Sequence, residues 1–147
     1  MLQPRRSAPW LLPGAKSTSY AVSIAAEAEA KARGADDAIF VDQDGIVLEG
    51  PVTNIWWREG DVLLTPSLEV GILAGETRAA LLELAAGNGQ VVEEGIYPLE
   101  RLLGADEAFT SSSIRELMPV VAVDGHPIPR GPVAAALQEA LRREARA

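Results

Sequence analysis

Four separated segments of the sequence carry side chains that could take part in chemistry. Lys16 precedes an Ala-rich segment, and Glu49 ends a short hydrophobic segment. Residues 71–78 form a glycine-bearing turn that opens a helix, whose first backbone N–H groups lack partners at its positive end. Residues 110–113 add four hydroxyl groups after a predicted strand. Each also has an ordinary interpretation: a surface lysine, a strand-end carboxylate, a helix start that binds nothing and a polar loop.

Together the four segments supply the groups that a pyridoxal phosphate site needs. A lysine amine can form a Schiff base with the cofactor, and a carboxylate can keep the pyridine nitrogen protonated. The protonated ring then withdraws electrons from a carbanion, while the amine moves the proton at the substrate carbon. A helix N-terminus with nearby hydroxyl groups can bind the phosphate. The residue types alone leave this as one interpretation among others.

The order and wording of the motifs resemble the class IV aminotransferase family, the fold-type IV group of pyridoxal phosphate enzymes. The family includes branched-chain aminotransferases, D-amino-acid transaminases and aminodeoxychorismate lyases. The resemblance covers about residues 14 to 128. Its motifs, in chain order, are KSTSY at 16–20, GADDAIFVD at 34–42, DGIVLEGPVTNI at 44–55, LTP at 64–66, GILAGETR at 71–78 and FTSSSIRELMPV at 109–120.

At the ring of the cofactor, the resemblance implies roles for three residues. Lys16 matches the lysine that forms the internal aldimine and transfers the proton. Tyr20 matches a phenol that hydrogen-bonds the ring oxygen, and a tyrosine packed on a helix face is its alternative. Glu49 matches the carboxylate at the pyridine nitrogen.

The resemblance implies roles for four more residues, three at the phosphate and one near the substrate. Glu76 and Thr77 match the pair whose backbone N–H groups hold the phosphate. Ser113 matches a hydroxyl that also reaches it, and Ser112 falls near the substrate carboxylate. The family usually carries an apolar residue in place of Glu76, because a carboxylate at close range repels a phosphate by about 1 kcal/mol or more. We therefore expect the Glu76 side chain to turn to water or to pair with Arg78.

Other distinctive residues favour structural roles. Asn54 is a motif residue that either ties down its turn or contacts ligand, and Arg78 either pairs with a carboxylate or contacts ligand. Trp56 and Trp57 point to opposite faces of a strand, so core packing is favoured for both. His126 follows a turn and receives no role.

Hydrophobic periodicity predicts the elements that must position these residues. We expect a mixed α/β (α+β) domain with a strand-rich centre and flanking helices, and the resemblance implies the C-terminal domain of the D-amino-acid-aminotransferase-like fold. The predicted helices are 20–33, 77–86, 98–103 and one that begins at Pro132. The predicted strands are 38–41, 46–48, 54–57, 62–65, 91–92, 107–111 and 117–123.

Composition narrows the function classes. The chain has 147 residues, with 13 Lys and Arg against 21 Asp and Glu, so 13 − 21 gives a formal charge of −8. The absence of Cys and the single His leave no thiolate or His-based metal site, so no metal is expected. The negative charge disfavours nucleic acid, and no apolar run reaches the roughly 18–20 residues of a membrane span. We expect a cytoplasmic protein without either partner.

The sequence predicts two parts. Residues 1–15 form an interdomain-linker-like segment, and residues 16–147 form the cofactor-binding C-terminal domain. The small N-terminal domain of the family is expected to be absent. In the family it supplies a phosphate-binding arginine, a wall of the substrate pocket and much of the dimer contact. The resemblance implies an amino-acid-like substrate and a homodimer.

The sequence of residues 109–120 most resembles that of aminodeoxychorismate lyases. This favours an aminodeoxychorismate-lyase-like enzyme, which eliminates pyruvate to give 4-aminobenzoate for folate synthesis. A branched-chain or D-amino-acid transaminase is the alternative. A truncated, non-catalytic remnant is a further alternative.

Overall fold

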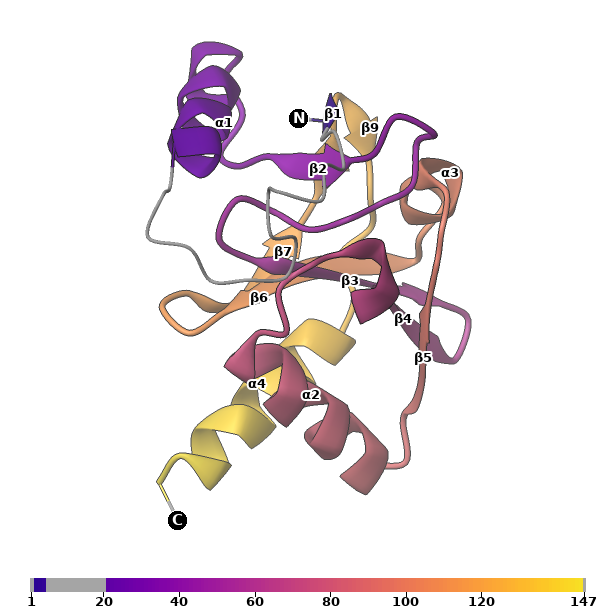
Figure 1. The fold of residues 1–147 in the computed structure, drawn as a ribbon. Coiled ribbons are helices and arrows are strands. Elements are labelled where there is room, and N and C mark those ends of the chain that lie inside the picture. The colour runs from indigo at the N-terminus through magenta and orange to yellow at the C-terminus, as the bar shows by residue number, and fades with distance from the viewer. Residues whose placement is uncertain (1, 5–20, 147) are drawn as a thin grey trace.

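The centre of the molecule is a five-stranded sheet with the order β5-β4-β3-β6-β7 (Figure 1). The computed structural model describes residues 2–4 and 21–146. β3 is antiparallel to both of its neighbours, β4 and β6, and β6 is antiparallel to β7, whereas β4 and β5 are parallel. The strands are β3 (Asn54–Glu59), β4 (Val62–Pro66), β5 (Val91–Gly95), β6 (Glu107–Ser112) and β7 (Glu116–Val120).

Two short pairs of strands flank this sheet. β1 pairs in parallel with β2, and β8 pairs with β9 in a hairpin. The backbone of β1 thus forms a strand within the segment expected to be linker-like. The strands are β1 (Leu2–Pro4), β2 (Ile39–Val41), β8 (Ala122–Val123) and β9 (His126–Pro127).

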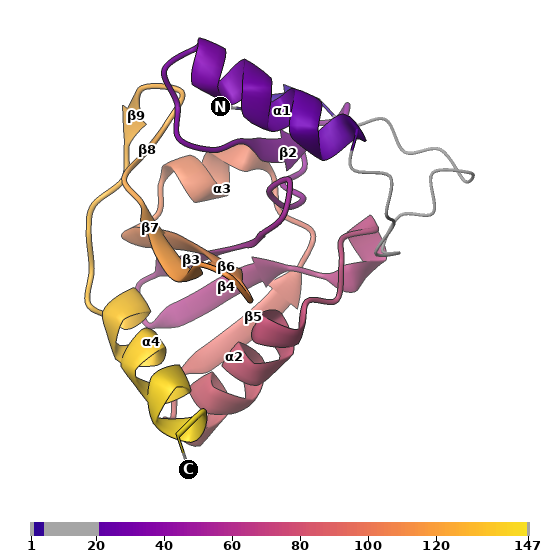
Figure 2. The ribbon, with the colours of Figure 1, turned by 90° about the vertical axis from the view of Figure 1, so that its left-hand side faces the viewer.

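Helices cover both faces of the central sheet. Figure 2 shows α2 and α4 on one side, with α1 and α3 on the other. The helices are α1 (Ala21–Ala32), α2 (Glu76–Gly87), α3 (Leu99–Leu103) and α4 (Val133–Glu144), and a short 3-10 helix, η2 (Leu68–Val70), precedes α2. Among the described residues, none of these helices has the length and apolar character to cross a membrane.

The alternation of side chains along β3 creates two cores, one on each face. Trp56 packs with Phe109 and Leu81 under α2 and α4. Trp57 packs on the other face with Tyr97 and the residues around α3. Both indoles are fully buried, which confirms that neither faces an open pocket.

A third, smaller core lies under α1. This helix buries two alanines, Ala26 and Ala30, against Phe40, Leu48 and Ile72. The packing brings α1 close to β2 and to residues 46–49, the strand-like segment that ends at Glu49.

The mixed α+β architecture is confirmed, and two predicted strands differ in detail. Within 46–48, Ile46 and Val47 form isolated bridges, with Pro98 and Val41, instead of a regular strand. The segment is still hydrogen-bonded to Phe40 of β2, while the Val47 N–H donates to the Tyr97 carbonyl. The segment 117–123 is broken at Val121. β7 follows β6 up to Val120, whereas the Val121 carbonyl accepts from the Ile128 N–H at the start of the small hairpin.

Candidate active site

The Glu49 carboxylate is directed at the loop that precedes α2. Its Oε2 accepts a hydrogen bond of 2.9 Å from the Leu73 N–H, and its backbone carbonyl accepts from the Phe40 N–H. The residue is 9% exposed, so the carboxylate lies in a largely buried position. The strand-like segment and the loop before α2 are therefore joined by the side chain that the sequence assigns to the cofactor ring.

A tight turn follows Glu49 and requires glycine at position 50. The Gly50 N–H donates to the Thr53 carbonyl over 2.8 Å. A Cβ on Gly50 would overlap the Thr53 hydroxyl, so any larger residue would displace the turn. Within the described part of the chain, the buried Thr53 Oγ1 has no hydrogen-bond partner. The turn therefore brings a buried hydroxyl against the backbone beside Glu49.

Asn54 holds the same loop from the other side. Its Nδ2 donates to the Leu73 carbonyl over 3.0 Å, and the residue is buried. Glu49 and Asn54 thus bind the N–H and the C=O of one residue, Leu73. This contact supports the interpretation that Asn54 ties down a turn. The turn it fixes is the one before α2, 19 residues away.

Among the described residues, no side chain caps the N-terminus of α2. Gly75 occupies the N-cap position in an extended conformation, and its missing side chain provides no cap. A Cβ there would lie 2.5 Å from the Asn54 Oδ1, so the close approach of Asn54 also requires glycine. The N–H groups of Glu76 and Thr77 are at the positive end of the helix, where an anion is stabilised.

The β6–β7 turn reaches this helix start. The Thr77 Oγ1 and the Ser113 Oγ are 3.5 Å apart, although the two residues are 36 positions apart in sequence. Ser112 instead accepts a hydrogen bond from the Arg115 N–H within its own turn. The structure therefore brings Thr77 and Ser113 together, and Ser112 supports the turn.

Arg78 makes its contacts inside the protein. Its side chain is buried, and its Nη2 donates to the Pro66 carbonyl at 2.9 Å and to the Glu94 carboxylate. The guanidinium lies 6.0 Å from the centre of the Trp56 ring. Glu94 is thus the carboxylate partner of Arg78, while Glu76 is exposed, as expected for a side chain that turns to water.

Lys16 and Tyr20 lie outside the described residues, so their predicted roles stay predictions. His126 is exposed in β9. Among the residues that the structure describes, no cluster of three His, Cys, Asp or Glu could hold a metal ion.

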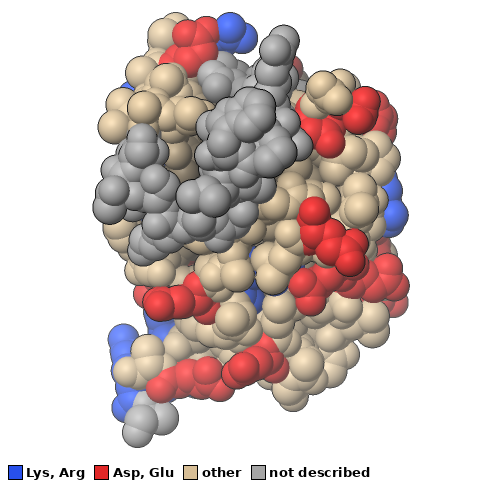
Figure 3. Space-filling model, viewed as in Figure 1, with Lys and Arg blue, Asp and Glu red and all other residues tan. Residues whose placement is uncertain are grey.

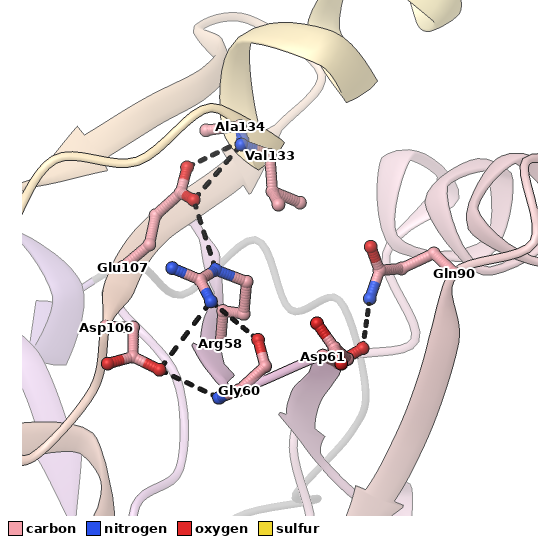
Figure 4. A network of polar contacts seen from close by, with 8 residues as sticks. All are labelled: Arg58, Gly60, Asp61, Gln90, Asp106, Glu107, Val133 and Ala134. Atoms are coloured by element: carbon pink, nitrogen blue, oxygen red, sulfur yellow. Dashed lines mark hydrogen bonds and ion pairs between the residues drawn. The ribbon is translucent and has the colours of Figure 1, made fainter.

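Sequence reasoning did not identify Glu107, a carboxylate that is 2% exposed. Its two oxygens accept the N–H groups of Val133 and Ala134 at 3.1 and 2.8 Å, and its Oε2 lies 3.7 Å from the Arg58 Nε (Figure 4). The sequence feature that could have indicated this contact is Pro132, which stands at the N-cap position of α4 and has no side chain able to cap the helix. The cap had to come from a distant residue.

A cavity of about 540 Å³ lies next to this network, lined by Arg58, Gly60, Gln90 and Val133 among others. It is at the Glu59 end of β3, whereas Asn54 and the candidate site are at the other end. The chemistry that the sequence indicates is therefore not located at this cavity.

A helix N-terminus without a side-chain cap, two neighbouring hydroxyls and a buried carboxylate thus lie together on a mixed α+β fold. The family model described as amino-transferase class IV matches residues 2–123. The chain belongs to the class IV aminotransferase family.

Relatives and solved structures agree with this assignment. The chain is 42% identical over 88 residues to an aminodeoxychorismate lyase of Bacillus subtilis, a match that covers 60% of the chain and 30% of the relative. A branched-chain aminotransferase structure from Thermoproteus uzoniensis has a TM-score of 0.89 and 40% identity, covering 95% of this chain and 48% of that one. A PLP-bound hypothetical aminotransferase from Mycobacterium tuberculosis has a TM-score of 0.85 and 36% identity, covering 91% and 47%. The chain therefore spans half or less of the length of these proteins.

Proposed function

We propose that this chain is the cofactor-binding portion of a pyridoxal-phosphate-dependent enzyme. The observation that carries the proposal is the convergence of three segments on the loop and first turn of α2. Glu49 bonds to Leu73, Asn54 bonds to the same residue, and Ser113 lies beside Thr77.

The described residues fit the phosphate group of this cofactor. The N-cap of α2 is a glycine, and no described side chain caps the helix there, so its first N–H groups are not used by a cap. Thr77 and Ser113 add two hydroxyls that can donate to phosphate oxygens. The exposed Glu76 is the one unfavourable charge, and its backbone N–H remains available for the anion.

Each residue has a defined task under this proposal. When bound, pyridoxal phosphate supplies an electron sink for the bond broken at the substrate carbon. Glu49, oriented by the Leu73 N–H, holds a proton at the pyridine nitrogen. Thr77 and Ser113 bind the phosphate and so orient the ring, and Lys16 attaches the ring and moves the proton at the substrate carbon.

For the reaction, we propose an aminodeoxychorismate-lyase-like activity. Two observations support this activity: the sequence of residues 109–120 and the B. subtilis relative named aminodeoxychorismate lyase. A branched-chain or D-amino-acid transaminase is the second candidate, favoured by the T. uzoniensis structure and by relatives named for D-amino-acid transamination. A lyase would release pyruvate from 4-amino-4-deoxychorismate without an added 2-oxo acid, whereas a transaminase requires that acceptor.

A non-catalytic remnant is the remaining alternative, favoured by the carboxylate of Glu76 at the predicted phosphate position. A cytoplasmic location and a homodimer that acts on an amino-acid-like substrate remain part of the proposal. Sedimentation of the chain with and without cofactor would measure the oligomeric state.

The decisive experiment uses the two lysines of the chain, Lys16 and Lys31. Pyridoxal phosphate is added, the product is reduced with borohydride, and the modified lysine is located by peptide mass. We expect the adduct on Lys16, its loss in Lys16→Ala and its retention in Lys31→Ala, because Lys31 is an exposed residue near the end of α1. An adduct shared equally by both lysines, or none, would contradict the proposal.

A further inference from the structure

Glu116 begins β7 in an unusual backbone conformation. Its φ is 53°, in the left-handed region that residues with a Cβ rarely adopt. It pairs with Ser112 across the β6–β7 turn, so the turn itself consists of 113–115. Glycine occupies such positions without steric cost. A glutamate here indicates that its side chain makes contacts that offset the unfavourable backbone.

Those contacts are with α4. The Glu116 Oε2 accepts hydrogen bonds from the Gln138 Nε2 at 2.9 Å and from the Arg142 Nε at 2.7 Å. Gln138 and Arg142 are four residues apart, so they lie on the same face of the helix. The Arg142 guanidinium, with Gln138, lowers the pKa of Glu116, which keeps the carboxylate ionised and paired at neutral pH.

The β6–β7 turn is also bonded to the segment before β2. The Arg115 Nη1 donates to the Asp37 Oδ2 at 3.3 Å, just before β2, and the Arg115 N–H donates to the Ser112 Oγ. The ties to Asp37 and to α4 leave from Arg115 and Glu116, which follow Ser113 in the chain. The hydroxyl that approaches Thr77 is therefore carried by a turn that is held from both sides.

The helix α4 also supports the other half of the site. Leu137 of α4 packs with Leu81 and Ala85 of α2 in the same buried cluster. One helix thus contacts the element that carries Thr77 and, through Glu116, the turn that carries Ser113. A fixed distance between the two hydroxyls requires both contacts.

We propose that Glu116 is a positioning residue for phosphate binding. Through Gln138 and Arg142 it fixes the β6–β7 turn on α4, so that the Ser113 hydroxyl faces Thr77 at the start of α2. This inference rests on the proposed function for the identity of the ligand. Glu116 acts through the turn and does not itself contact the phosphate.

The test compares binding of pyridoxal phosphate with binding of pyridoxal, which has the same ring and lacks the phosphate. We expect Glu116→Gln and Arg142→Ala each to lower the preference for the phosphorylated form by about fivefold to tenfold, while pyridoxal binds as before. The double variant should lose less than the sum of the two single losses, because both changes act on the same contact between Glu116 and Arg142. Arg143→Ala is the matched control, since Arg143 pairs only with Glu139 on the same helix among its described contacts.

A second measurement does not depend on any ligand. Amide hydrogen exchange at 113–115 should be faster in Glu116→Gln, Arg142→Ala and Glu116→Gly than in the unaltered chain. Glu116→Gly removes the tie to α4 in a residue that accepts the positive φ, although glycine also adds backbone freedom. A merely structural role would accelerate exchange in the turn and leave the preference for the phosphate unchanged.

The outcomes separate the two proposals. If the unaltered chain does not distinguish pyridoxal phosphate from pyridoxal, the proposed function fails and the phosphate role of Glu116 fails with it. If the unaltered chain distinguishes them and Glu116→Gln and Arg142→Ala do so equally well, this inference alone is overturned.

Discussion

Gly75 connects the local chemistry of the site to its packing. It leaves the α2 N-terminus without a side-chain cap, and the space that its side chain would fill is occupied by the Asn54 amide. Asn54 cannot easily move, because it is buried and bonded to the Leu73 carbonyl. The same close contact therefore anchors the preceding loop and leaves no room for a capping side chain at position 75.

Gly75→Ala should accordingly weaken both stability and binding. We expect a loss of about 1–3 kcal/mol in the free energy of unfolding, from overpacking against Asn54. Pyridoxal phosphate affinity should fall by about tenfold, or ~1.4 kcal/mol. Urea unfolding and absorbance titration measure the two effects.

Gly87→Ala is the control for the same helix. Nothing lies within 4 Å of a Cβ added at Gly87, and alanine is favoured over glycine in a helix by up to about 1 kcal/mol. It should leave binding unchanged and stability equal or higher. Equal losses in both variants would show that Asn54 does not restrict position 75.

At the residue scale, the sequence predicts types and order well and predicts partners poorly. Thr77 and Ser113 were assigned to one anion, and they are adjacent in the structure. The bond from the Leu73 N–H to Glu49 was not predictable, because it joins residues 24 positions apart with no local pattern. The choice of Glu94 as the partner of Arg78 was not predictable either, because β5 comes close to Arg78 only through its parallel pairing with β4.

At the scale of elements, the junction of β6 with α4 depends on Glu107. This carboxylate caps two N–H groups of the helix and neighbours Arg58 across the sheet, as Figure 4 shows. Gly131 is needed beside it, because a Cβ there would overlap the carboxylate. The helix that supports the candidate site is therefore held at its first turn by a strand of the central sheet.

Glu107→Ala should be strongly destabilising. Removing the carboxylate leaves two N–H groups of the helix start without their acceptor, at about 1–3 kcal/mol each, while Arg58 keeps Asp106 and the Gly60 carbonyl. Glu107→Gln should lose about 1–3 kcal/mol, because an amide keeps one acceptor and presents a donor to the other N–H. Thermal unfolding would measure both.

Glu139→Ala is the control on the same helix. Its contact with Arg143 is exposed on both sides, so the change should stay within about 0.5 kcal/mol. A Glu107→Ala variant as stable as Glu139→Ala would rule out the capping role.

Element prediction succeeded where the periodicity was strong. The alternation of β3 placed Trp56 and Trp57 in separate cores, and the helical spacing in α2 and α4 identified their buried faces. It was less accurate at 46–48 and 117–123, where apolar residues continue but their hydrogen-bond partners change. A hydrophobic pattern indicates which side chains are buried and carries no information on which strand pairs with the backbone.

At the scale of the whole molecule, acidity is the dominant property of the surface. The formal charge is −8, and Asp and Glu predominate over Lys and Arg on the face shown in Figure 3. Mutual repulsion weakens as the pH falls and carboxylates become protonated. Individual paired carboxylates act in the opposite direction, so the pH dependence of stability is a balance of the two.

Glu59 is the carboxylate with which this balance can be measured. Arg101 donates two hydrogen bonds to it and Trp57 one, and together they lower its pKa, with partial burial and, more weakly, Asp106 opposing. A lowered folded-state pKa means that Glu59 stabilises the fold above the unperturbed value of about 4.3. That contribution is lost as the pH falls through the folded-state pKa.

The prediction compares the unaltered chain with Glu59→Gln by urea unfolding from pH 7 to pH 3. The unaltered chain should be more stable by about 1 kcal/mol near neutral pH, and the difference should shrink below about pH 4. A difference that is constant across this range would contradict the ionic contribution of Glu59.

The division of β3 between two cores also has an optical consequence. Trp56 is stacked near Phe109 beneath α2 and α4, and Trp57 meets the edge of Tyr97 on the opposite face. Each indole therefore reports by its fluorescence on one layer of the domain. On a Trp10→Phe background, which removes the third tryptophan of the chain, the emission left in Trp56→Phe or Trp57→Phe would follow the loosening of one face at a time, so that events at the face of α2 can be distinguished from those at the face of α3.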